Sequence, residues 1–175
     1  MKKVALFFTY IFITVFFVIV FLPKISLYYK AEELLHSKQI VFMGESLSDN
    51  GISFSLKEAR LYYDDLYVAN FSEISITTLL LYNKLHVDAF TLSSEMKQFL
   101  PQEVEYLDVS YSVIDPLHVN ISASGEFGEL EGSVNVRDRN GSLHLLPSPQ
   151  LSKQKPFWLR KLKKVEGEYI YAIRY

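Results

Sequence analysis

Nineteen consecutive residues without a charge, Val4 to Leu22, form the most constraining feature of the chain. Lys2 and Lys3 precede this run, and Pro23-Lys24 follows it. In hydrocarbon, backbone amides are satisfied only within a helix or a closed barrel. A helix of this length spans about 28 Å, close to the roughly 30 Å core of a bilayer. The run therefore predicts an N-terminal transmembrane segment over residues 1–23, with both lysines on the cytoplasmic side.

A cleaved signal peptide is the alternative interpretation of this run. Signal peptides have a shorter apolar core, about 7–15 residues, and a cleavage site of the small-x-small type. The residues from Leu22 to Tyr29 contain nothing that resembles Ala-x-Ala. An uncleaved signal-anchor is therefore the preferred interpretation, and we expect the rest of the chain to lie across the membrane.

The composition of the remaining chain argues against two classes of function. The chain holds 18 Lys plus Arg, of which Lys2 and Lys3 belong to the anchor, against 20 Asp plus Glu. A mildly acidic domain is not typical of a nucleic-acid binder, which usually carries a basic excess on one face. The chain has no cysteine, which excludes a disulfide framework and thiolate chemistry.

The hydrophobic period changes after the anchor. Leu27, Ala31, Leu34 and Leu35 recur at helical spacing within residues 25–38, so we expect a juxtamembrane helix in the segment 24–39. From Ile40 the period is two, and residues 40–175 are predicted to form one periplasmic β domain. The alternating runs cover 52–56, 66–69, 74–77, 85–89, 104–113, 117–121, 130–136, 142–145 and 168–175. Short helices are expected at 93–100 and 157–164.

Turn-forming residues separate these runs. They are Asp49-Asn50-Gly51, Asp64-Asp65, Asn83-Lys84, Asp115-Pro116 and Asn140-Gly141. Asn-Gly is the strongest hairpin signal, because both central residues of a type I′ turn need a positive φ. The same turn is preferred over glycosylation as the explanation of the Asn-x-Ser pattern at Asn140. Hairpin-connected strands predict a mainly β fold, namely a transmembrane helix followed by a curled antiparallel meander with an open groove.

No arrangement of residues in the sequence predicts catalysis. His86, His118 and His144 occupy equivalent positions in alternating runs, so all three are expected to point away from the apolar face. A row of histidines near Asp88 could hold a metal ion, but solvent-facing residues of a sheet are the preferred interpretation. We therefore assign no catalytic residue, no metal ligand and no cofactor, and we do not expect an enzyme.

Two stretches of the sequence resemble one family. They run from Gly51 through Ile74 to Leu92 and from Gly125 to Ser148, and they share a pattern of Gly, Leu and alternation. In this respect the chain resembles the AsmA-like envelope proteins and the related type II secretion protein N. The resemblance implies an anchor in the bacterial inner membrane, with a cytoplasmic N-terminus and a single pass. It also implies a periplasmic antiparallel sheet curled around an apolar groove, and a role in lipid handling, secretion or envelope assembly.

The preferred function is therefore that of an anchored periplasmic protein that binds an acyl chain or an envelope partner. Six apolar residues of alternating strands are the candidate groove lining: Phe54, Leu56, Leu85, Val87, Val119 and Ile121. Ordinary sheet core is the alternative role for each of them. The competing class is a scaffold without enzymatic activity that holds another envelope protein by strand addition at an open sheet edge. The expected partners are the lipid bilayer and an acyl chain or a protein complex, and not nucleic acid.

Overall fold

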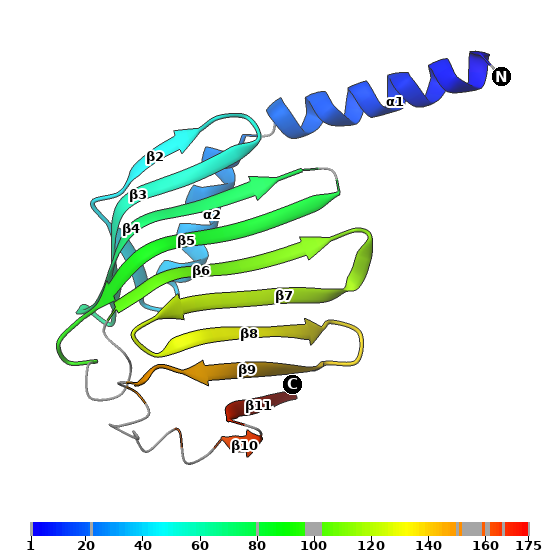
Figure 1. Ribbon diagram of the computed structural model, residues 1–175. Coiled ribbons are helices and arrows are strands. Elements are labelled where there is room, and N and C mark those ends of the chain that lie inside the picture. The colour runs from blue at the N-terminus through cyan, green and yellow to red at the C-terminus, as the bar shows by residue number, and fades with distance from the viewer. Residues whose placement is uncertain are drawn as a thin grey trace.

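The computed structural model (Figure 1) describes residues 2–21, 23–79, 81–96, 103–149, 151, 159, 162–165 and 167–174, without the side chains of residues 2 and 19. In this part of the chain the protein is mainly β, with an open antiparallel sheet of 11 strands and two helices. The predicted mainly β antiparallel class is thereby confirmed.

The two helices precede the sheet. Helix α1 covers Lys2–Phe21 and helix α2 covers Lys24–His36, with Pro23 at the start of α2. Proline cannot donate a backbone hydrogen bond, so it suits a helix start. The helix predicted within residues 25–38 is confirmed by α2. Among the described residues, no helix is both long enough and apolar enough to cross a membrane.

Most of the strands pair in the order in which they follow α2. Seven consecutive strands, β3 to β9, form a meander in which each strand pairs with the next, and β1 and β2 both pair with β3. At the other edge β11 pairs with β9 and β10 pairs with β11. The bounds are β1 Ile40–Met43, β2 Ser46–Asp49, β3 Ser53–Tyr63, β4 Leu66–Thr78, β5 Tyr82–Leu92, β6 Glu103–Ser112, β7 Asp115–Gly125, β8 Gly128–Asn135, β9 Asn140–Pro147, β10 Lys163–Val165 and β11 Glu168–Arg174.

The first long strands bend together at one level of the sheet. In β3 the buried apolar positions step by two from Phe54 to Leu56, but by three from Leu56 to Ala59. Between them Glu58 has a φ of 58°, a left-handed conformation that is uncommon outside glycine. The register of β3 with β4 is the same on both sides of Glu58, so the strand bends there without an inserted residue. Figure 1 shows the neighbouring strands β3 to β6 curving at this end of the sheet.

The strongest predicted hairpin lies at the wrong position. Asn140 pairs with Asn135 and Gly141 pairs with Val134, so the predicted Asn140-Gly141 turn belongs to strand β9. The connection occupies residues 136–139 instead. The side chain of Asn135 accepts hydrogen bonds from the backbone N–H groups of Arg137 (3.0 Å) and Asp138 (2.9 Å), which stabilises this earlier turn.

Other local predictions also need correction. Asn83-Lys84 lies within β5, and Asp115-Pro116 begins β7. Both turns are therefore earlier than predicted, between Thr78 and Tyr82 and between Ser112 and Asp115. Ser93 to Met96 forms no helix, and residues 97–100 lie outside the described part. Of the helix predicted at 157–164, Lys163 and Lys164 belong to strand β10, and residues 157, 158, 160 and 161 lie outside the described part.

Candidate apolar ligand site

One face of the sheet is apolar along its whole width. A first row of register partners joins Phe54, Ile76, Leu85, Val109, Ile121, Gly132, Leu143 and Tyr171 across β3 to β11. A second row, two residues along each strand, joins Leu56, Ile74, Val87, Leu107, Ala123, Leu130, Leu145 and Tyr169. Residues two apart on a strand share a face, so both rows form one continuous apolar surface.

Different elements cover this face near its two edges. Over β3 and β4, the ring of Tyr28 in α2 lies 5.6 Å from the ring of Phe54. Over β9, the buried residues Leu151 and Leu159 pack in a cluster with Leu145. Between these covers the face is less protected, since Val109 and Ile121 are only partly buried. At the rim of α2, the side chain of Ile76 remains 41% exposed. The apolar face is therefore partly a packed core and partly an open surface.

An apolar cavity of the sheet lies beside the Leu145 cluster. Its volume is about 420 Å³. The lining is formed by aliphatic and aromatic side chains from β5, β6, β8, β9 and β11 together with the connecting segments: Phe90, Leu92, Val104, Phe127, Leu130, Leu143, Leu145, Leu162, Tyr169 and Tyr171. Sites for small apolar ligands are typically concave and lined in this way, with volumes of about 300–1,000 Å³. This arrangement can hold a hydrocarbon chain and offers little to a polar substrate.

The six residues predicted to line a groove all belong to the apolar face, but none of them lines this cavity. Phe54, Leu56 and Val87 are at most 6% exposed and act as core residues of the sheet. Leu85, Val119 and Ile121 are half-buried on the less protected part of the face. Phe54 also lines a smaller cavity of about 270 Å³ beneath α2.

Part of the cavity lining follows a pattern that is visible in the sequence. Leu143 and Leu145 alternate in β9, and Tyr169 and Tyr171 alternate in β11, so their shared face could be deduced. Their convergence with Phe90 and Val104 could not, because it depends on the bend of β3 to β6 and on the pairing of β11 with β9.

Tyr28 makes a polar contact between α2 and the residues that follow β1. The Tyr28 hydroxyl donates a hydrogen bond of 3.0 Å to Oε1 of Glu45. Burial raises the pKa of Tyr28 above its usual range, and the neighbouring Glu45 carboxylate raises it further. Tyr28 therefore remains a hydrogen-bond donor at any ordinary pH, with its ring against Phe54.

The opposite face of the sheet is polar and contains the three predicted histidines. His86 and His144 lie in one row with Asp108, Ser122 and Glu131 between them, and His118 lies in another row. Each histidine has its own carboxylate, namely Asp108 at 2.6 Å, Asp115 at 2.8 Å or Glu168 at 3.3 Å. Across the described residues, no three metal-ligating side chains gather in one place.

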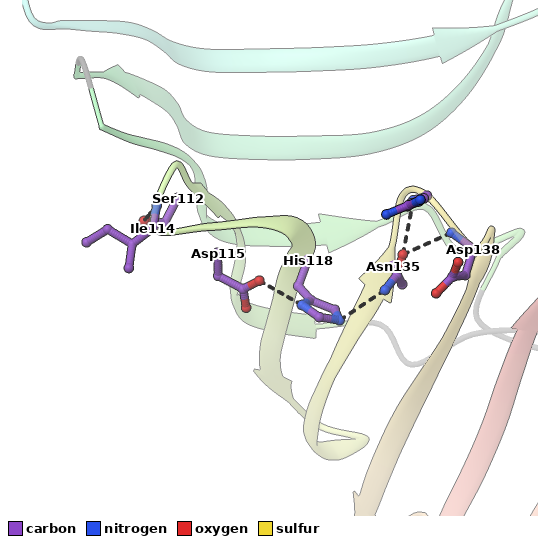
Figure 2. Close-up of polar contacts among 7 residues, drawn as sticks. Ser112, Ile114, Asp115, His118, Asn135 and Asp138 are labelled. Atoms are coloured by element: carbon purple, nitrogen blue, oxygen red, sulfur yellow. Dashed lines mark hydrogen bonds and ion pairs between the residues drawn. The ribbon is translucent and has the colours of Figure 1, made fainter.

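His118 connects two hairpin ends by hydrogen bonds to Asp115 and Asn135 (Figure 2). Nδ1 of His118 lies 2.8 Å from Asp115, and Nε2 lies 3.3 Å from the side-chain nitrogen of Asn135. Because the Asn135 oxygen accepts two backbone N–H bonds, its nitrogen must donate to His118. Nε2 then accepts, and Nδ1 donates to Asp115. The network ties the start of β7 to the 136–139 turn.

Comparison of the chain with protein-family models, with curated proteins and with solved structures gives no match.

Proposed function

We propose that the chain is an anchored envelope protein of the bacterial inner membrane whose periplasmic β-sheet binds an acyl chain. The observation that carries this proposal is the cavity of about 420 Å³ on the apolar face. Its lining residues are all apolar or aromatic, so the favourable contribution to binding would come from burial of hydrocarbon, about 0.8 kcal/mol for each CH₂ group. The resemblance to AsmA-like proteins supports the same class of function.

The proposed anchor rests on helix α1. The uncharged run of the sequence extends from Val4 to Leu22 and includes Ile19 and Leu22, which lie outside the described side chains. Large apolar side chains of α1 such as Phe7, Phe8 and Phe12 are each 59–64% exposed. A helix that presents aromatic and aliphatic groups on all sides needs an apolar environment around it. We propose the bilayer as that environment.

The lengths of the edge strands favour the lipid over a scaffold that binds by strand addition. At one edge β1 and β2 have four residues each, and at the other edge β10 has three. Short edge strands are a common means of preventing pairing with another chain. Binding on the apolar face is therefore the better-supported mode of interaction.

Photochemical labelling in a bilayer tests the proposal. The full chain is reconstituted in lipid nanodiscs that contain a phospholipid with a diazirine at the end of one acyl chain. After illumination, adducts are mapped by peptide mass spectrometry. We expect adducts on the cavity residues of β9 and β11, in addition to those on α1.

Two matched substitutions make this experiment specific. Leu143→Trp fills the cavity with an apolar ring and should remove the β9 and β11 adducts. Leu146→Trp is the control, because Leu146 lies three residues along the same strand on the polar face and is 51% exposed. Adducts confined to α1, or adducts on β9 that persist in Leu143→Trp, would contradict acyl binding in the cavity.

A further inference from the structure

Exposed apolar side chains gather at the hairpin tips of one end of the sheet. The tips in question are the turns that connect β2 to β3, β4 to β5, β6 to β7 and β8 to β9. Six residues, here called the tip row, are each 38–88% exposed: Ile52, Leu79, Leu81, Val113, Ile114 and Val136. Single exposed apolar residues are normal on a protein surface, but a group of them at one end marks a contact surface.

Hydrogen bonds between the turns hold the tip row together. Backbone N–H groups of Thr78, Val113 and Val136 donate to the carbonyls of Ile52 (3.0 Å), Leu81 (3.0 Å) and Leu117 (2.9 Å), respectively. Within the β6–β7 turn, the N–H of Ile114 donates to Oγ of Ser112 at 3.2 Å. The side chain of Ile114 nevertheless points away from the strands into open space (Figure 2). The turns are therefore ordered while their apolar side chains remain uncovered.

Helix α1 leaves the sheet at this same end (Figure 1). Nζ of Lys24, which is only 7% exposed, donates to the carbonyl oxygen of Gly51 and lies 3.7 Å from Asp49. A Cβ on Gly51 would lie 3.2 Å from the side chain of Val20, near the end of α1. These contacts fix the exit of α1 on the β2–β3 turn, which is the first turn of the tip row.

The charges of the two sheet ends differ. At the tip end, Lys24, Arg137 and Arg139 stand against Asp49, Asp115 and Asp138, so basic and acidic groups are balanced there. The described turns at the opposite end carry four carboxylates against Lys38: Asp64, Asp65, Glu95 and Glu126. An anionic membrane surface can accept the tip end, where long arginine stems can lie along apolar groups.

We propose that the tip row inserts into the headgroup region of the bilayer that holds α1. This inference rests on the proposed anchor, because α1 determines which end of the sheet faces the membrane. Four turns in contact with the bilayer, in addition to one helix, hold the sheet upright on the membrane surface. A second copy of the chain or another protein is the alternative occupant of the tip row.

Site-specific fluorescence measures this contact in the full chain. The sequence has no cysteine, so a single cysteine at Ile114 or Val136 can be labelled with an environment-sensitive fluorophore. The labelled chain is placed in nanodiscs of phosphatidylethanolamine and phosphatidylglycerol, and quenching is measured with aqueous iodide and with nitroxide-labelled lipid. Asp65→Cys, in the β3–β4 turn at the opposite end, is the control position. Co-elution with the nanodiscs reports on the anchor separately.

The expected result is strong quenching of the labels at 114 and 136 by the lipid nitroxide. Their quenching by iodide should be at least about threefold weaker than at 65, because an interfacial group lies about 5–10 Å below the surface. Equal iodide quenching at all three positions overturns the proposal. Protection from iodide without nitroxide quenching also overturns it and identifies a protein as the occupant. A chain that fails to co-elute with the nanodiscs overturns the anchor, and the inference with it.

Discussion

Oδ1 of Asp108 in β6 lies 2.6 Å from Nδ1 of His86, its register partner in β5. Its second oxygen lies 3.0 Å from Nζ of Lys84. Burial alone would raise the pKa of Asp108, but the hydrogen bonds from His86 and Lys84 outweigh burial and lower the pKa below its ordinary value. The pair links two central strands on the polar face of the sheet.

The lowered pKa makes the stability depend on pH in a defined direction. The ionised carboxylate of Asp108 stabilises the fold above its unfolded pKa of about 3.9, and this contribution is lost as the pH falls through the lower folded pKa. We expect Asp108→Asn to lower the free energy of unfolding by roughly 1–2 kcal/mol at neutral pH. The difference from the parent should shrink toward pH 3 in denaturant titrations followed by circular dichroism.

Asp65→Asn is the control for this change. Asp65 lies in the β3–β4 turn with a φ of 62°, a conformation that asparagine tolerates as well as aspartate does. An Asp108→Asn variant that loses stability equally at every pH would show that the effect is steric rather than electrostatic.

Gly141 tests the corrected position of the β8–β9 turn. In the structure a Cβ at this position would lie 2.6 Å from the carbonyl oxygen of Ser133 and 2.9 Å from Cα of Val134. Backbone atoms cannot move away easily, so Gly141→Asn should destabilise the domain by about 1–3 kcal/mol. If Gly141 were instead in a type I′ turn, asparagine would be well tolerated at its positive φ.

Gly44 provides the matched comparison for Gly141→Asn. Its φ is +79°, and the nearest atom to a Cβ is Nη2 of Arg60 at 3.4 Å, which belongs to a flexible side chain. We expect Gly44→Asn to change the midpoint of unfolding only slightly. Equal losses for the two variants would remove the argument for close packing at Gly141.

The sequence predicted the alternating strands of this protein, but it did not predict where the strands bend or where one of the turns lies. The alternating runs 85–89, 117–121 and 142–145 correspond to β5, β7 and β9, because a period of two is a local property of a half-buried strand. The 136–139 turn depends on the side chain of Asn135 and on its distant partner His118, so a local Asn-Gly signal could not place it. The cavity requires β5 and β6 to face the returning strand β11, which is a property of the whole sheet.

The junction of α1 with the sheet depends on Lys24. Replacement by methionine keeps the length and the apolar stem but removes the bond to the Gly51 carbonyl and the ion pair with Asp49. Because Asp49 still accepts from the Gly51 N–H at 2.8 Å, the turn itself should persist. We expect a loss of about 1–3 kcal/mol in the free energy of unfolding.

The measurement for Lys24→Met is limited proteolysis in nanodiscs together with denaturant unfolding. Cleavage near Pro23 should become faster while cleavage within the sheet remains unchanged. Lys30→Met, on an exposed position of α2, is the control. Unchanged cleavage at the junction would show that Lys24 does not hold α1 against the sheet.

Leu85 and Val87 distinguish the open part of the apolar face from its packed part. They lie two residues apart on β5 and face the same side, yet Val87 is 6% exposed and Leu85 is half-buried beside the exposed Ile76. A carboxylate at Val87 is buried without a partner, so Val87→Asp should cost roughly 3–5 kcal/mol and unfold much of the domain. A carboxylate at Leu85 can be hydrated, so Leu85→Asp should leave the circular dichroism spectrum of the sheet intact.

If an acyl chain extends over this part of the face, Leu85→Asp should also reduce photochemical adducts on β5 and β7. Unfolding of both variants to the same extent would show that the face is a closed core at Leu85, and would confine acyl binding to the cavity near Leu145.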